Sequence, residues 1–212
     1  MRSKEIKKAI DSLGPWYQRF EMEGQFTTNS RISGEPIWPD LRSIFPEEIE
    51  GMNILEIGSN AAYYSAMLVK AGANVTAIEP NKKYFLQGRW TQYFFEQYGD
   101  RYPIEFINES VDKIKYKDLG WFDYILLSTG IDLIKPSNKK KFLLNLFEHT
   151  DKVIIITKND SINNSIGYFN SIFLEHSIYI LKRINTKTPI LMFGRLVKDP
   201  IFIEQINKME TE

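Results

Sequence analysis

From residue 53 onward, short apolar runs alternate with longer stretches in which apolar residues recur every three or four positions. The short runs predict buried strands and the longer stretches predict amphipathic helices, an alternation typical of βαβ units around a mostly parallel sheet. We predict five parallel strands at residues 53–57, 74–78, 104–107, 122–127 and 152–157. We predict helices at residues 61–71, 82–99, 137–148 and 160–176.

Two further β-rich runs follow at residues 178–184 and 189–197. Only Asn185-Thr186-Lys187 and Thr188 separate them, and strands joined by so short a connection must be antiparallel. We therefore predict a Rossmann-like α/β fold. It has a seven-stranded, mostly parallel sheet with an antiparallel C-terminal hairpin and helices on both faces.

The first 50 residues follow a different pattern. Apolar residues at helical spacing predict a short helix over residues 3–13, which stops at Gly14-Pro15. Residues 16–40 show no sustained period but are rich in aromatic residues. Three of these can form either a lid over a ligand site or a clasp packed on the edge of the sheet: Trp16, Tyr17 and Phe20. We predict residues 1–50 as this N-terminal segment and residues 51–212 as the sheet domain.

Composition and charge exclude several classes of function. The sequence has no cysteine and two histidines, which excludes thiolate nucleophiles, disulfides and cysteine-based zinc or iron–sulfur sites, and we predict no metal. The 27 Lys+Arg and 27 Asp+Glu give a net charge of zero, so the chain lacks the uniform positive field that holds nucleic acid by its phosphates. A local patch, Lys139-Lys140-Lys141, can meet phosphates or simply form a solvated helix face.

The apolar content fits a globular protein. With 43% hydrophobic residues the chain can fill a core, and none of its apolar runs approaches the length of a membrane span. The first ten residues lack the apolar stretch of a secretory signal. We therefore expect a soluble, cytoplasmic protein with no membrane partner.

The predicted fold also predicts where a ligand binds. In an open sheet of this kind, ligands lie outside the carboxyl ends of the parallel strands, near the point where the strand order reverses. This rule selects the loops that follow the five predicted parallel strands. They are residues 58–62, Glu79-Pro80, residues 108–110, residues 128–132 and residues 158–160.

The first two loops carry a glycine and a carboxylate at a characteristic distance. Gly58 lets a ligand approach the backbone, and the helix start that follows favours a negatively charged group. Glu79 comes 21 residues after Gly58, near the spacing of about 20 at which an acidic side chain binds ribose hydroxyls. The alternative is a tight turn and a solvated strand end, but the two features together in a βαβ setting favour a ribose site.

A nicotinamide-dependent dehydrogenase shares this fold and this carboxylate. Its fingerprint G-x-G-x-x-G needs glycines where the pyrophosphate touches the backbone, and the second and third of those positions are Asn60 and Tyr63 here. A ligand without a pyrophosphate fits better. The acid inside the first strand, Glu56, is typical of S-adenosylmethionine sites, so we predict that cofactor.

Longer motifs carry a resemblance to a known family. Over Leu13 to about Leu127 the chain resembles the class I methyltransferases related to the tRNA wobble-uridine carboxymethyltransferase. The matching pieces are LGPWY (13–17), the run ending in Trp38, LEIGSNAAYYS (55–65), AGANVTAIEP (71–80), QGRW (87–90) and FDYILL (122–127). The resemblance implies an S-adenosylmethionine-dependent methyltransferase of the class I fold.

The resemblance also implies which residues bind the cofactor. Residues along the methionine part are Gly58, Ser59, Asn60, Ala61 and Ala62. Glu79 holds the ribose, and Glu56 and Pro80 are also predicted to bind the cofactor. Those flanking the adenine are Glu109, Ser110 and Val111, and those beneath the sulfonium are Ser128 and Thr129.

Two positions depart from the family pattern. The family usually has glycine where this chain has Ala62, and relatives have a Tyr-His pair where this chain has Asp132-Leu133. Asp132 is the best-placed candidate for a general base, and its alternative role is a helix cap or loop carboxylate. Lys158, Asn159 and Asp160 can orient a polar acceptor, or the last of them can cap the next helix.

The acceptor is predicted less directly. We expect methyl transfer to a small molecule or a glycan, at oxygen rather than nitrogen. One alternative is a tRNA-modifying methyltransferase. The other is a methyltransferase-like binding protein that has lost catalysis, which the departures at Ala62 and Asp132-Leu133 leave open.

Overall fold

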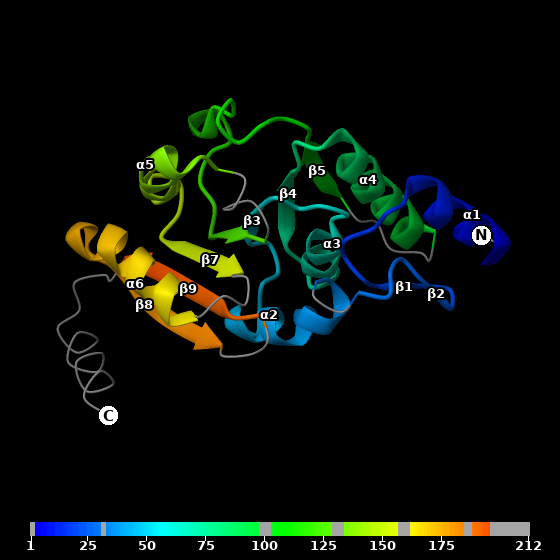
Figure 1. The fold of residues 1–212 in the computed structure, drawn as a ribbon, viewed down its shortest axis with the longest axis horizontal. Coiled ribbons are helices and arrows are strands. Elements are labelled where there is room, and N and C mark those ends of the chain that lie inside the picture. The colour runs from blue at the N-terminus through cyan, green and yellow to red at the C-terminus, as the bar shows by residue number, and fades with distance from the viewer. Residues whose placement is uncertain are drawn as a thin grey trace.

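A computed structural model describes residues 3–30, 33–97, 103–128, 134–156, 162–184 and 188–195. Its centre is a seven-stranded sheet with the order β5-β4-β3-β6-β7-β9-β8 (Figure 1). The strands are β3 (Asn53–Ile57), β4 (Asn74–Ile78), β5 (Ile104–Ile107), β6 (Tyr124–Leu127), β7 (Lys152–Ile156), β8 (Ile178–Ile184) and β9 (Ile190–Arg195). Strands β3 to β7 pair in parallel, while β9 pairs antiparallel with both β7 and β8. The predicted seven-stranded Rossmann-like fold is confirmed.

The strand order reverses at β3, which lies between β4 and β6. Chain order runs from β3 outward to β4 and β5, and then returns to the other side of β3 with β6. The loops that follow β3, β4 and β6 therefore diverge from neighbouring points on one edge of the sheet. The ligand site predicted from the sequence lies at this edge.

Helices cover both faces of the sheet (Figure 1). The full set is α1 (Ser3–Leu13), α2 (Trp38–Ile44), α3 (Tyr63–Lys70), α4 (Lys82–Glu96), α5 (Pro136–Leu146) and α6 (Ile162–Phe173), with short 3-10 turns at Glu35–Ile37, Tyr116–Asp118 and Leu174–His176. Because alternate strand residues point to opposite faces, Ile54 belongs to the core beneath α2, α3 and α4, while Leu55 belongs to the core beneath α5 and α6. Glu56 shares the face of Ile54.

Several element boundaries differ from the predicted ones. Helix α3 begins at Tyr63 rather than at residue 61, because Asn60 and Ala62 have left-handed backbones that no helix accepts. Strand β6 begins at Tyr124 rather than at residue 122. The two preceding backbone amides do not join the parallel hydrogen-bond ladder of β6. Phe122 N donates to His149 O, and Asp123 N donates to Asn53 O.

The buried face of α4 differs from the stripe that helical spacing alone predicts, which comprises Leu86, Trp90, Tyr93 and Phe94. Leu86 and Tyr93 are 45% and 50% exposed. The residues that are buried instead are Gln87, Gly88, Thr91 and Phe94. Gln87 lies inward because α4 faces the N-terminal segment, and the backbone turn of that segment offers carbonyl groups as acceptors. Gln87 Nε2 donates to Leu13 O at 2.7 Å and to Pro15 O at 2.9 Å.

The N-terminal segment shares the core of the sheet domain. It contains α1, a small hairpin of β1 (Glu21–Met22) and β2 (Gln25–Phe26) that the sequence analysis missed, and α2. Trp16 and Phe20 are buried in the same apolar cluster as α3 and α4. Trp16 meets Trp90 edge to face at 6.3 Å, and Phe20 stacks on Tyr63 at 5.1 Å. These two aromatic residues therefore pack against α3 and α4.

No helix within the described ranges is both long and apolar enough to cross a membrane. Helix α4, the longest of the described helices, has 15 residues.

Candidate functional site

The loop between β3 and α3 turns tightly at the reversal point of the sheet. Gly58, Asn60 and Ala62 all have left-handed backbones, with φ of 77°, 55° and 57°. The amides of Gly58 and Ser59 both donate to Ile78 O, at 2.9 and 3.0 Å, which fastens the loop to the end of β4. The turn leaves the side chains of residues 59–62 buried at the carboxyl edge of the sheet.

Glu56 is a fully buried carboxyl group just below this loop. Ser65 Oγ, on α3, donates to Glu56 Oε2 at 2.5 Å, while Oε1 has no hydrogen-bond partner among the described residues. Burial raises the pKa of Glu56 to about 7, although the hydrogen bond from Ser65 lowers it. A carboxyl group in this state can ionise when a cation such as an ammonium group comes against its open oxygen.

Glu79 ends β4 and reaches back toward the first loop. Its Oε2 accepts from Asn60 N at 2.9 Å, its Oε1 accepts from Asn81 N at 2.8 Å, and only 2% of the residue is exposed. Burial raises the pKa of Glu79, while the hydrogen bonds from the two amides lower it. Each oxygen keeps a second lone pair, so the carboxylate can still accept from two neighbouring hydroxyl groups.

The loop after β5 is tied to Glu79 through an asparagine. Asn108 Nδ2 donates to Glu79 O at 2.7 Å and to Pro80 O at 3.2 Å. The next residues form a turn in which Glu109 Oε1 accepts from Ser110 N at 2.9 Å. Glu109 is exposed, and Val111 is half-buried against the apolar core of α5. The structure therefore brings the predicted adenine loop beside the predicted ribose residues.

The loop after β6 joins the site from the other side. Ser128 is buried, and its Oγ donates to Gly58 O at 2.8 Å, while Ser128 N donates to Ile57 O at 3.2 Å. Thr129 and Asp132 lie outside the described residues, as do the predicted positions after β7, Lys158, Asn159 and Asp160.

Buried polar atoms without partners gather around the first loop. Nearly all buried polar groups in native proteins are hydrogen-bonded, so such atoms call for an explanation. They are Glu56 Oε1, Ser59 Oγ and Asn60 Oδ1, together with Gln18 Nε2 from the N-terminal segment and Gln87 Oε1 from α4. A polar ligand that offers both donors and acceptors can satisfy them. Among the residues with described positions, no group of three or more histidine, aspartate or glutamate side chains is arranged to hold a metal.

Two of these residues escaped the sequence analysis. Gln18 directly follows the LGPWY motif, and Gln87 opens QGRW, but the residue type alone gives neither a role. Gln18 Oε1 accepts from Tyr63 N at 3.1 Å, so the N-terminal segment reaches the first turn of α3. The signal that could have found them is their position at two motifs that accompany the loop motif along the chain, with Gln18 directly after one and Gln87 inside the other.

Ala62 has a strained backbone, which gives a physical reason for the glycine usual in the related family. Its φ of 57° and ψ of 30° are left-handed, a conformation that costs an alanine about 1–2 kcal/mol and glycine little. We expect Ala62→Gly to raise the free energy of unfolding by roughly 0.5–1 kcal/mol, after the greater chain entropy of glycine is subtracted. Urea denaturation of both proteins measures the change.

Ala66→Gly is the matched control, because Ala66 lies buried inside α3 with a right-handed backbone. That substitution should lower the free energy of unfolding by about 1 kcal/mol. If both variants were destabilised alike, strain at Ala62 would be ruled out.

Comparison with known proteins establishes the fold. No protein-family model matches the sequence, and no curated protein matches it either. Solved structures do match. The N-terminal domain of EvdMO1 with SAH bound is 14% identical, covers 92% of this chain and 97% of its own, and has a TM-score of 0.66. Magnesium protoporphyrin IX methyltransferase (ChlM) from Synechocystis PCC 6803 with bound SAM is 13% identical, covers 75% of each chain, and has a TM-score of 0.58.

A third match is the putative RNA methyltransferase PH1948 from Pyrococcus horikoshii. It is 17% identical, covers 92% of this chain and 100% of its own, and has a TM-score of 0.57. At these identities the matches establish that the chain has the fold of class I methyltransferases. The finer resemblance to the tRNA wobble-uridine carboxymethyltransferase stays a prediction.

Proposed function

We propose that this protein is an S-adenosylmethionine-dependent methyltransferase. The observation that carries the proposal is the set of unpartnered buried atoms in and below the loop after β3, namely Glu56 Oε1, Ser59 Oγ and Asn60 Oδ1. They lie beside Glu79, a buried carboxylate with free lone pairs, at the reversal point of the sheet. Solved structures with the same fold hold SAM or SAH, which supports the choice of ligand.

Each part of the cofactor has residues suited to it. Glu56 would meet the ammonium group of the methionine part, and Glu79 would accept from the ribose hydroxyls. The positions proposed to flank the adenine are Glu109, Ser110 and Val111. When bound, the cofactor supplies a methyl group already activated by a positively charged sulfur. The protein's task is therefore alignment and exclusion of water, with Ser128 and Thr129 proposed beneath the sulfonium.

For the acceptor we propose a small molecule or a glycan. The zero net charge argues against a surface built for a long nucleic acid. The likeness to the N-terminal domain of EvdMO1, which was also crystallised in the presence of SAH and D-fucose, supports a sugar-sized acceptor. Asp132 is the proposed general base, on the sequence argument alone.

The test has two stages. Mass spectrometry of the denatured, freshly purified protein should release S-adenosylmethionine or S-adenosylhomocysteine, and calorimetry should give saturable binding of both. The protein is then incubated with methyl-labelled S-adenosylmethionine and a library of sugars, phenols, amines and tRNA. Transfer to a sugar or small molecule supports the full proposal, and activity on tRNA alone would contradict the acceptor. Binding without transfer to any of these acceptors would favour the binding-protein alternative.

We also expect the protein not to bind NAD or NADP below millimolar concentration. The glycine path for a pyrophosphate is interrupted by Asn60 and by Tyr63, whose ring is buried and stacked on Phe20. Calorimetric titration measures this, with S-adenosylhomocysteine binding by the same sample as the positive control. Nicotinamide binding that competes with S-adenosylhomocysteine would contradict the proposed ligand.

A further inference from the structure

Gln18 is a fully buried carboxamide that the N-terminal segment places against the first turn of α3. Tyr63 N donates to its side chain at 3.1 Å, and because a backbone amide can only donate, the side-chain atom facing it is the oxygen. The side-chain nitrogen Nε2 therefore occupies the other corner of the carboxamide. It is buried and has no hydrogen-bond partner within the part of the chain that the structure describes. Two N–H groups of Gln18 are thus held next to the loop after β3 without a hydrogen-bond acceptor among the described residues.

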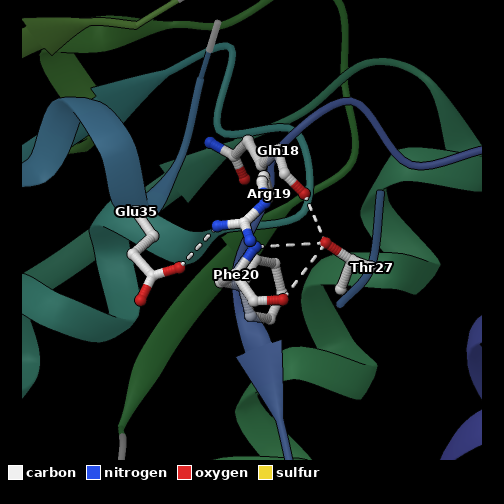
Figure 2. A network of polar contacts seen from close by, with 5 residues as sticks. All are labelled: Gln18, Arg19, Phe20, Thr27 and Glu35. Carbon is white, nitrogen blue, oxygen red and sulfur yellow. Dashed lines mark hydrogen bonds and ion pairs between the residues drawn. The ribbon is translucent and has the colours of Figure 1, made fainter. Parts of the chain in front are cut away.

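The backbone at Gln18 is fixed from both sides (Figure 2). On one side Thr27 Oγ1 donates to Gln18 O at 2.7 Å and accepts from Phe20 N at 3.2 Å. On the other side Arg19 pairs with Glu35 at 3.1 Å. Figure 2 shows Thr27 and Glu35 on opposite sides of the segment that carries Gln18. The carboxamide is therefore positioned before any ligand arrives, as a binding group should be.

The surroundings of Nε2 favour a negatively charged group of a ligand. Nε2 can only donate, so it cannot receive the ammonium group of a ligand, for which the carboxyl group of Glu56 is suited. The first turn of a helix carries partial positive charge, and Gln18 lies at the start of α3. Glu79, the group suited to ribose, reaches the loop at Asn60 instead. A carboxylate that is joined to an ammonium group, as in an amino acid, matches Gln18 and Glu56 together.

We infer that Gln18 donates from Nε2 to the α-carboxylate of the methionine part of S-adenosylmethionine. This inference rests on the proposed function and assigns the N-terminal segment a part in cofactor binding. A hydrogen bond from a neutral donor to a charged acceptor changes affinity by about 10- to 100-fold.

The test compares two nucleosides that differ in the amino-acid part. S-adenosylhomocysteine carries the α-carboxylate, while 5′-methylthioadenosine has the same adenosine and sulfur without it. Gln18→Glu keeps an oxygen to accept from Tyr63 N and replaces the donor by an anionic oxygen. We expect this variant to bind S-adenosylhomocysteine about 10- to 100-fold more weakly and to bind 5′-methylthioadenosine within about twofold of wild type.

Gln25→Glu is the matched control, since it makes the same charge change in the same segment at a half-exposed position of β2. It should leave both affinities unchanged, and thermal melting should find both variants folded. Equal loss of both ligands in Gln18→Glu would mean that Gln18 only positions the loop, and would overturn the inference. So would an unchanged affinity for S-adenosylhomocysteine, or a rise in the acceptor KM alone, which would assign Nε2 to the acceptor.

Failure of the proposed function has a different signature. Wild-type protein would then bind neither nucleoside, and the inference about Gln18 would be wrong together with the proposed function. When wild-type protein binds 5′-methylthioadenosine, the adenosine site is intact, and any difference between the two nucleosides in the variants belongs to the α-carboxylate alone.

Discussion

Glu79→Ala is expected to weaken the binding of S-adenosylhomocysteine by about 1–3 kcal/mol, or roughly 5- to 150-fold. The carboxylate is buried and can accept from both ribose hydroxyls at once, and hydrogen bonds to a charged acceptor are the stronger kind. Calorimetry at neutral pH measures the loss. Glu48→Ala removes an equal charge from an exposed position and should leave the affinity unchanged.

Glu79 also supports the loop, because it accepts from Asn60 N and Asn81 N. A ligand-side comparison separates this support from ribose binding. Wild-type protein should prefer 5′-methylthioadenosine to its 2′,3′-dideoxy form, and Glu79→Ala should lose that preference, because only the ribose hydroxyls differ between the two ligands. If the preference survived in Glu79→Ala, Glu79 would be a loop anchor and not the ribose ligand.

The binding of S-adenosylhomocysteine is expected to depend on pH through Glu56. Its pKa of about 7 means that the carboxyl group is protonated below pH 7 in the free protein, whereas pairing with an ammonium group needs the ionised form. Affinity should therefore be about tenfold weaker at pH 6 than at pH 7.5. At higher pH, as the ligand's own amino group loses its proton, the affinity should fall again. Calorimetry across this range, in buffers of different ionisation enthalpy, measures affinity and proton release together.

Glu56→Gln should remove the acidic limb of this profile and lower the affinity at pH 7.5. Its effect on stability has the opposite sign. Burial raises the pKa of Glu56 from 4.5 to about 7, so the folded protein holds a proton that the unfolded chain releases, and stability falls as pH rises from 4.5 to 7. Without ligand, the variant should be more stable than wild type above pH 7, by up to about 3 kcal/mol, and similar to it near pH 4.5. Urea denaturation at pH 5 and pH 8 measures this, and an unchanged pH profile in Glu56→Gln would rule out Glu56 as the titrating group.

The sheet could be predicted from the sequence because its strands are short apolar runs between clear breakers. The predicted bounds of β3, β4, β5 and β8 agree with the structure, and the C-terminal hairpin follows from the brevity of its connection. Helix α1 is also predicted with its bounds, because Gly14-Pro15 ends it. Such signals are local, and neighbouring elements do not alter them.

Long-range contacts could not be predicted in the same way. The inward face of α4 is polar at Gln87 because the carbonyl groups it meets belong to a turn more than 70 residues earlier. The same holds for Gln18, whose partner Tyr63 is 45 residues away. Within the site, the loops at the strand ends were predictable from the topology, and the cofactor roles proposed for Glu56 and Glu79 still await the experiments above.

The packing of the N-terminal segment also delays the folding of this segment during synthesis. The segment leaves the ribosome before the residues it packs on, Tyr63, Gln87 and Trp90. Helices as short as α1 and α2, with 11 and 7 residues, are marginal in water on their own. Phe20 therefore stays without Tyr63, and Trp16 without Trp90, until those residues have been made. Substitutions in this segment should first lower the yield of folded protein. The reason is that the nascent chain must keep these aromatic residues from other contacts until α4 emerges.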